Sequence, residues 1–160
     1  MREYMKPTIY FAADHWGFEL IPELVSFVHD ELGYETEHCG PFEYNAEDDY
    51  PDFIQVAATN VAEDPENRKA IIFGKSGQGE AMCANRFPGV RAAVFYGGPA
   101  EIVTLSREHN NANVLSLGAG FLSLDEAKMV IANWLATEFT GEERHARRIA
   151  KLDQIIVEQS

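Results

Sequence analysis

The segment 74–80, GKSGQGE, combines three glycines with a lysine, a serine and a glutamate. It directly follows the apolar run Ala70–Phe73, which places it between a strand and a helix. Glycines let a backbone approach a ligand closely, and the start of a helix directs N–H groups toward an anion. The pattern predicts a cradle for an anionic oxygen beside the Glu80 carboxylate. Two plainer interpretations stay open: an ordinary tight turn, and a carboxylate that only caps the helix.

Other polar side chains lie at the ends of predicted elements. Asp14 and His15 follow the apolar run 8–13, and His109 ends a predicted helix just before the run 113–117. In a parallel sheet, ligands bind beyond the carboxyl ends of the strands. We therefore expect Asp14 and His15 to lie in a cleft with segment 74–80. For His109 the helix dipole alone is a sufficient alternative explanation.

Several other kinds of site are poorly supported. Segment 74–80 lacks the closing Gly-Lys-Ser/Thr of a Walker A loop and does not match Gly-x-Gly-x-x-Gly. No His-x-x-x-His or Cys-x-x-Cys spacing occurs, so no metal is expected. Cys39 and Cys83 are too few for a disulfide scaffold, which favours the cytoplasm.

The elements that must position these residues alternate along the chain. Predicted strands cover 8–13, 35–39, 70–73, 90–96 and 113–117, and predicted helices cover 18–32, 51–61, 80–86, 99–108, 124–139 and 143–157. The run 70–73 is the clearest central strand, and the polar run 35–39 suits an edge. Such alternation implies right-handed crossovers. We expect one α/β domain over 1–160, a three-layer, five-stranded parallel sheet with helices on both faces, Rossmann-like or flavodoxin-like, plus a C-terminal helix.

Charge and hydropathy limit the partners. Residues 1–70 carry 4 basic and 16 acidic side chains, and residues 71–160 carry 9 and 10. A nucleic-acid binder needs Lys and Arg to neutralise phosphates, so no nucleic-acid partner is expected. No apolar run reaches the ~20 residues of a membrane span, and Met1–Lys6 lacks a signal-peptide core. A small anion still fits the cationic cluster Arg144, Arg147, Arg148 and Lys151.

Several short motifs occur in a fixed order. They are Asp14-His15-x-Gly17-x-Glu19-Leu20, Asp49-Tyr50-Pro51, Gly74-x-Ser76-Gly77-x-Gly79-Glu80, Ala84-Asn85-Arg86-x-Pro88-Gly89-Val90-Arg91, the run 107–113 (REHNNAN) and Arg144-His145-x-x-Arg148. In this order they resemble the type B ribose-5-phosphate isomerases, which share a larger family with the galactose-6-phosphate isomerase subunits. The resemblance runs from about residue 8 to residue 152. Segment 39–51, with Ser-Gly-x-Gly-Glu, is most similar to the actinobacterial branch, whose base is a glutamate instead of a cysteine.

The resemblance implies a cofactor-free aldose–ketose isomerase that acts through an enediolate, with ribose 5-phosphate as the default substrate. Glu80 matches the base position, and residue 74, where cysteine-type members carry their base, is glycine here. His109 would open the sugar ring, and Asn110 would hold that end of the sugar. The oxyanion would be held by Ser76 and by the backbone of Lys75, Gly77, Gln78 and Gly79. The sugar hydroxyls would contact Asp14 and His15, and the phosphate would contact Arg144 and Arg148.

Members of this family are dimers or assemblies of dimers with a shared active site. The resemblance therefore implies a homodimer, with a tetramer left open. The final predicted helix offers an apolar set for such packing, although the same side chains would also cover their own domain. The set is Ile149, Leu152, Ile155 and Ile156.

Three positions depart from the family pattern. Gly120 stands where an arginine usually helps to bind phosphate, Lys75 replaces a small glycine, and Trp16 replaces a small residue. They leave open a hexose 6-phosphate or an unphosphorylated sugar as substrate, or a noncatalytic sugar-phosphate-binding protein. A nucleotide-binding flavodoxin-like module is a separate alternative, for which no nucleotide fingerprint occurs. A long lysine stem can bring its ammonium to a phosphate from another origin, so Lys75 is expected to compensate for Gly120. The alternative is a lysine that points into solvent.

Overall fold

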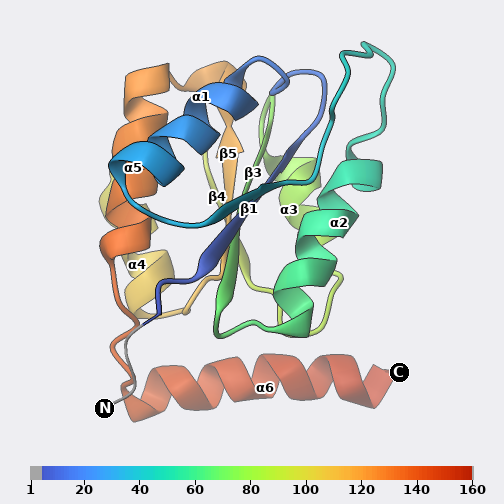
Figure 1. Cartoon of the computed structure of the whole chain (residues 1–160). Coiled ribbons are helices and arrows are strands. Elements are labelled where there is room, and N and C mark those ends of the chain that lie inside the picture. Colours follow the sequence, from blue (N-terminus) through green and yellow to red (C-terminus); the bar gives the residue numbers. More distant parts are fainter. Residues whose placement is uncertain (1–4, 160) are drawn as a thin grey trace.

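Five strands form one parallel sheet in the order β2-β1-β3-β5-β4 (Figure 1). The computed structural model describes residues 5–159, with only the backbone of residues 156–159. The strands are β1 (Thr8–Ala13), β2 (Thr36–His38), β3 (Arg68–Gly74), β4 (Ala92–Phe95) and β5 (Val114–Gly118). The predicted five-stranded parallel sheet is confirmed, with β3 at its centre and β2 at an edge.

Helices cover both faces of the sheet, as expected. One face holds α1 (Leu20–Ser26), which continues into a π-helical segment (Phe27–Glu31), together with α4 (Glu101–Glu108) and α5 (Leu124–Ala136), and the other holds α2 (Tyr50–Glu63) and α3 (Gln78–Ala84) (Figure 1). The sequence places the end of α5 three residues too late. The Thr137 hydroxyl donates to the Asn133 carbonyl at 2.7 Å, and Thr137 itself has extended backbone angles. This local hydrogen bond competes with the next helical turn and ends the helix.

The apolar core lies in two layers, one on each side of the sheet. Ile9 and Phe11 of β1 point toward α1 and α5, whereas Tyr10 and Ala12 point toward α2. Successive side chains of a strand alternate between faces, so a strand buried on both faces is a continuous apolar run. That is why the strand positions are visible in the sequence.

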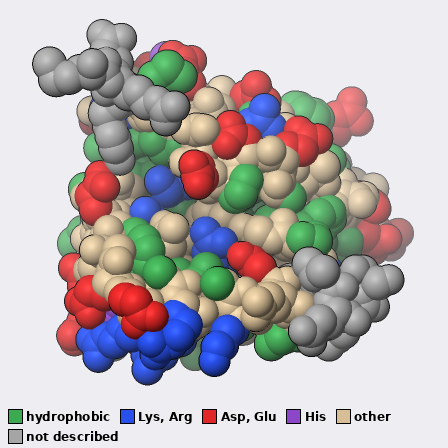
Figure 2. Space-filling model, turned by 90° about the horizontal axis from the view of Figure 1, so that it is seen from below, with side chains coloured by type: hydrophobic (Ala, Val, Ile, Leu, Met, Phe, Trp, Pro, Cys, Tyr) green, Lys and Arg blue, Asp and Glu red, His purple; other side chains and the backbone are tan. Residues whose placement is uncertain are grey.

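The last helix, α6 (Glu143–Gln159), lies across the end of the sheet where the strands begin (Figure 1). Leu152 and Ile155 are about half exposed on it, and the side chain of Ile156 lies outside the described part. Figure 2 shows this end of the molecule, with Lys and Arg side chains gathered along one edge. No helix within residues 5–159 is long and apolar enough to cross a membrane.

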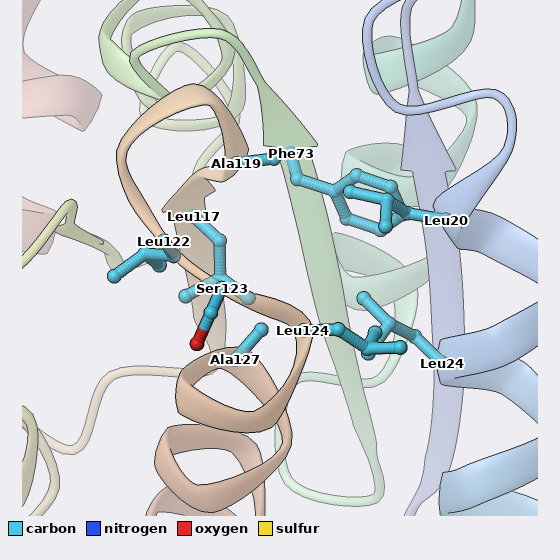
Figure 3. Close-up of a pocket in the computed structure, with 9 residues that line it drawn as sticks. All are labelled: Leu20, Leu24, Phe73, Leu117, Ala119, Leu122, Ser123, Leu124 and Ala127. Atoms are coloured by element: carbon cyan, nitrogen blue, oxygen red, sulfur yellow. The ribbon is translucent and has the colours of Figure 1, made fainter.

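An apolar cavity of about 80 Å³ lies between α1 and α5, near the ends of β3 and β5 (Figure 3). Phe73 and Leu117 reach into it from the strands, directly before Gly74 and Gly118. The cavity therefore lies behind the loops that follow these two strands. The other lining residues are Leu20, Leu24, Ala119, Leu122, Ser123, Leu124 and Ala127.

Candidate active site

The sheet has its switch point between β1 and β3. From β1 the chain crosses outward to β2, whereas β3 adjoins β5 on the other side. A crevice opens at such a point beyond the carboxyl ends of the strands. Ala13 is in register with Phe73, so Asp14 and Gly74 leave the sheet side by side. The sheet topology therefore brings Asp14 and His15 next to segment 74–80, as predicted from the sequence.

Glu80 lies in the first turn of α3 and is only 5% exposed. Gly77 precedes the helix with a left-handed φ of 76°, which turns the chain back over the end of β3. The Glu80 carboxylate then fills the space beside the Gly74 Cα, where any side chain at residue 74 would overlap it. A glycine at 74 and a carboxylate at 80 are thus two parts of one arrangement.

Both buried carboxyls of the crevice have perturbed acidity. Burial raises the pKa of the Glu80 carboxyl, and the Asp14 charge raises it further against a hydrogen bond from its own backbone N–H. Burial also raises the pKa of Asp14, whose Oδ1 accepts a hydrogen bond from the Trp16 N–H at 2.8 Å. Carboxyls shifted by burial in a crevice are typical of functional sites.

His15 is held by a carboxylate from a distant segment. Its Nδ1 lies 2.8 Å from Asp48 Oδ1, and its backbone N–H donates to the same oxygen at 3.2 Å. These contacts hold the imidazole ring through its Nδ1 and its backbone. Asp48 was not predicted as a site residue, although it lies beside the Asp49-Tyr50-Pro51 motif.

Segment 74–80 also packs closely on its neighbours, as expected of a tight turn between a strand and a helix. The Ser116 hydroxyl donates to the Gly77 carbonyl at 2.6 Å. A Cβ on Gly77 would lie 2.9 Å from the Leu117 carbonyl carbon, and one on Gly79 would lie 2.7 Å from the Tyr50 hydroxyl. The Ser76 hydroxyl accepts from the Gln78 N–H at 3.3 Å, so its own proton is available to a ligand.

Of the three residues that depart from the family pattern, Lys75 contacts both of the others. The Lys75 ammonium lies 5.2 Å from the centre of the Trp16 ring. A Cβ on Gly120 would lie 2.9 Å from Lys75 Cγ. Lys75 and Trp16 are both exposed.

The remaining predicted site residues lie at the opposite end of the sheet. His109 and Asn110 follow α4 and precede β5, and Arg144 and Arg148 lie on α6 across the same end. At ~3.3 Å per residue, the length of β5 alone separates its two ends by about 13 Å. Within one chain, the packed sheet therefore divides the predicted site residues into two groups.

The second group contains a residue with an unexpected role. The His145 ring stacks on His109 with centroids 4.2 Å apart and planes 16° apart, and it is 5% exposed. His145 is therefore a buried residue that packs on His109, and not only one more polar residue of the helix surface. Arg144 and Arg148 are exposed beside it, and Arg144 Nε donates to Glu142 at 3.1 Å.

The described residues give little support for a metal site or for a cysteine as the base. Within them, no group of three His, Cys, Asp or Glu side chains is placed to hold a metal ion. Cys39 and Cys83 are free thiols. Burial raises the pKa of Cys83, which disfavours the thiolate that a base would need.

A buried carboxylate pair lies beside a glycine-rich loop at the switch point of the sheet. This combination is typical of Rossmann-like enzymes that act on small molecules. The sequence profile of the ribose/galactose isomerase family matches residues 9–152. The chain belongs to this family.

Named relatives agree with this assignment. The chain is 37% identical to ribose-5-phosphate isomerase B of Mycolicibacterium paratuberculosis over 141 residues, which cover 88% of this chain and 86% of that protein. It is also similar in structure to ribose-5-phosphate isomerase B from Mycoplasma genitalium with bound ribulose-5-phosphate, with a TM-score of 0.89, 32% identity, and coverage of 97% and 99%. The Clostridium thermocellum enzyme has a TM-score of 0.87, 37% identity, and coverage of 96% and 99%.

Proposed function

We propose that this protein interconverts ribose 5-phosphate and ribulose 5-phosphate through an enediolate, with Glu80 as the base. The observation that carries the proposal is the Glu80 carboxylate, buried against Gly74 at the switch point. The names of the relatives support the choice of substrate.

The reaction moves one proton from C2 to C1 and a second proton from the O2 hydroxyl to O1. Glu80 takes the proton from C2 and returns it to C1, so the carboxyl must alternate between both protonation states. Burial raises the pKa of Glu80 toward the working pH, which improves both half-steps. The Ser76 hydroxyl and backbone amides of residues 75–79 donate to the enediolate oxygens. Asp14 and His15, the latter fixed by Asp48, hold sugar hydroxyls.

A second copy of the chain completes this site. His109 then opens the sugar ring, Asn110 holds that end of the sugar, and Arg144 and Arg148 bind the phosphate at the crevice of the partner. Two features support the homodimer. The two groups of residues lie at opposite ends of one sheet, and Leu152 and Ile155 of α6 remain exposed. A tetramer of two such dimers is compatible with the same arrangement.

The proposal includes no cofactor, because proton transfer between carbons needs only a base, hydrogen-bond donors and an anchor. We also propose that the protein is located in the cytoplasm. Cys39 and Cys83 are free thiols, which suits a reducing compartment.

The test is an assay of ketose formation from ribose 5-phosphate, allose 6-phosphate and galactose 6-phosphate. We expect ribose 5-phosphate to be preferred. Glu80→Gln should lower kcat by at least ~100-fold with little change in KM, the usual scale for loss of a general base. Cys83→Ser is the matched control on the same helix and should stay active. An inactive Cys83→Ser together with an active Glu80→Gln would overturn the assignment of the base.

A further inference from the structure

Lys75 is the only Lys or Arg in the loops that follow the five strands, at 14–19, 39–49, 75–77, 96–100 and 119–123. The same loops carry carboxylates, among them Asp14, Asp48 and Asp49. An anionic substrate that enters this crevice would therefore meet one cationic side chain from this chain. Together with the arginines that a second copy contributes, that ammonium determines where the anionic end of the substrate can lie.

An aromatic ring holds the Lys75 side chain in place. Its Nζ lies 5.2 Å from the centre of the Trp16 ring, within the range of a cation–π contact. Among the described residues, no carboxylate lies within ion-pair distance of Lys75. The face of an indole ring attracts a cation without neutralising it. The three N–H donors of the ammonium therefore remain available to an incoming anion.

Gly120 provides the space that the lysine stem occupies. Its N–H donates to the Lys75 carbonyl at 3.0 Å. A Cβ on Gly120 would lie 2.9 Å from Lys75 Cγ and 3.0 Å from the Lys75 carbonyl oxygen. Any side chain at residue 120 would displace the stem, and with it the ammonium above the Trp16 ring.

We propose that Trp16, Lys75 and Gly120 form one anion-binding unit at the mouth of the crevice. Lys75 is the cation that this chain contributes to binding the sugar phosphate, in addition to Arg144 and Arg148 of the second copy, and Trp16 and Gly120 are positioning residues. A lysine normally loses much rotamer freedom when it binds a ligand, and the Trp16 ring removes part of that loss in advance. The identification of the anion as a sugar phosphate rests on the proposed function, whereas the anion site itself does not.

The kinetic test compares variants of the full chain with ribose 5-phosphate as substrate. Lys75→Met should raise KM about 10-fold or more, the range expected for a lost charged hydrogen bond, with kcat within ~2-fold. Trp16→Leu should raise KM in the same direction, and the double variant should be no worse than Lys75→Met. Gly120→Ala should resemble Trp16→Leu. Lys75→Arg keeps both the charge and the ring contact and should preserve most of the affinity.

The matched control is Lys128→Met. Lys128 Nζ lies 5.5 Å from the centre of the Phe27 ring, so the same kind of contact is removed on the helical face, away from the crevice. Its KM should not change. A second measurement titrates the protein with inorganic phosphate by calorimetry, and Lys75→Met should bind it more weakly than Lys128→Met does.

Two results would overturn the proposal. Unchanged KM and unchanged phosphate binding in Lys75→Met would mean that the ammonium points into solvent during binding. Fully additive effects of Trp16→Leu and Lys75→Met would mean that the two residues are not one unit. If the unmodified protein fails to convert ribose 5-phosphate, the proposed function fails, and the phosphate titration still decides the anion site.

Discussion

Ionisation of the buried Glu80 carboxyl lowers the free energy of unfolding of the protein. In an unfolded chain this carboxyl titrates near 4.5, and burial raises its pKa in the folded protein. Well below pH 4.5 the group is neutral in both states and has little effect on the free energy of unfolding. As the pH rises through the folded pKa, the buried group must ionise and stability falls. The property that suits a base therefore also weakens the fold.

We predict that Glu80→Gln stabilises the protein at neutral pH, because glutamine carries no charge to bury. The expected rise in Tm is about 2–4 °C near pH 7. It should shrink as the pH falls and vanish below about pH 4, where Glu80 is protonated. Thermal melts of both proteins across this range are the measurement. A gain in Tm that does not depend on pH would point to packing instead of the buried charge.

The same pKa shift predicts the pH dependence of turnover. A base must be ionised in the free enzyme, so kcat/KM should fall on the acidic side with an inflection above 4.5. Asp14→Asn removes the neighbouring negative charge that helps to raise the pKa of Glu80. In that variant the inflection should move to lower pH, measured as a kcat/KM profile with ribose 5-phosphate. An inflection that stays in place would exclude a contribution from Asp14.

His109 should matter most for cyclic substrates. We predict that His109→Ala slows turnover of ribose 5-phosphate at least ~100-fold, the scale of a lost acid–base group. A tetrose 4-phosphate cannot close a furanose through its phosphorylated oxygen, so its turnover should suffer much less. Steady-state kinetics on both sugars distinguish the two roles. Equal losses would make His109 a binding residue or a support for the stacked His145 ring.

At the scale of elements, burial decides what the sequence reveals. The strand 8–13 has the predicted bounds because apolar residues on both faces make it a continuous run. The end of α5 was misplaced because it depends on one hydroxyl, that of Thr137. The loop 74–80 was identifiable from its glycines, but its contacts were not. Nothing in the local sequence shows that Gly77 lies on Leu117 or Gly79 on Tyr50.

The cavity behind the loops predicts a stabilising substitution. Ala127 of α5 is buried and lines the apolar space of about 80 Å³, so Ala127→Leu adds methyl groups where there are no atoms (Figure 3). We expect a rise in Tm of about 2–4 °C, as for other cavity-filling changes. Ala136→Leu adds the same group at the exposed end of the helix and is the control. Thermal melts measure both, and a lower Tm for Ala127→Leu would mean that the space is too narrow for the added carbons.

At the scale of the whole molecule, the order of the motifs does not show which end of the sheet each one reaches. Segment 107–111 immediately precedes a strand, and in a parallel sheet that fact alone assigns it to the amino end. The signal was therefore present for His109. For Arg144 and Arg148 it was not, because α6 crosses the sheet and does not follow the alternation of strands and helices. Only the assembled fold separates these residues from Glu80.

This separation makes a prediction that can be tested with two purified heterodimers. If each site combines Glu80 of one chain with His109 of the other, a dimer of one Glu80→Gln chain and one His109→Ala chain keeps one intact site. Its activity should be about half that of the unmodified dimer, because a two-fold dimer has two equivalent sites. The control dimer pairs an unmodified chain with a chain that carries both substitutions. There each site loses one residue, so this dimer should be nearly inactive. If each site lies within one chain, the two results exchange places, and the shared site is refuted.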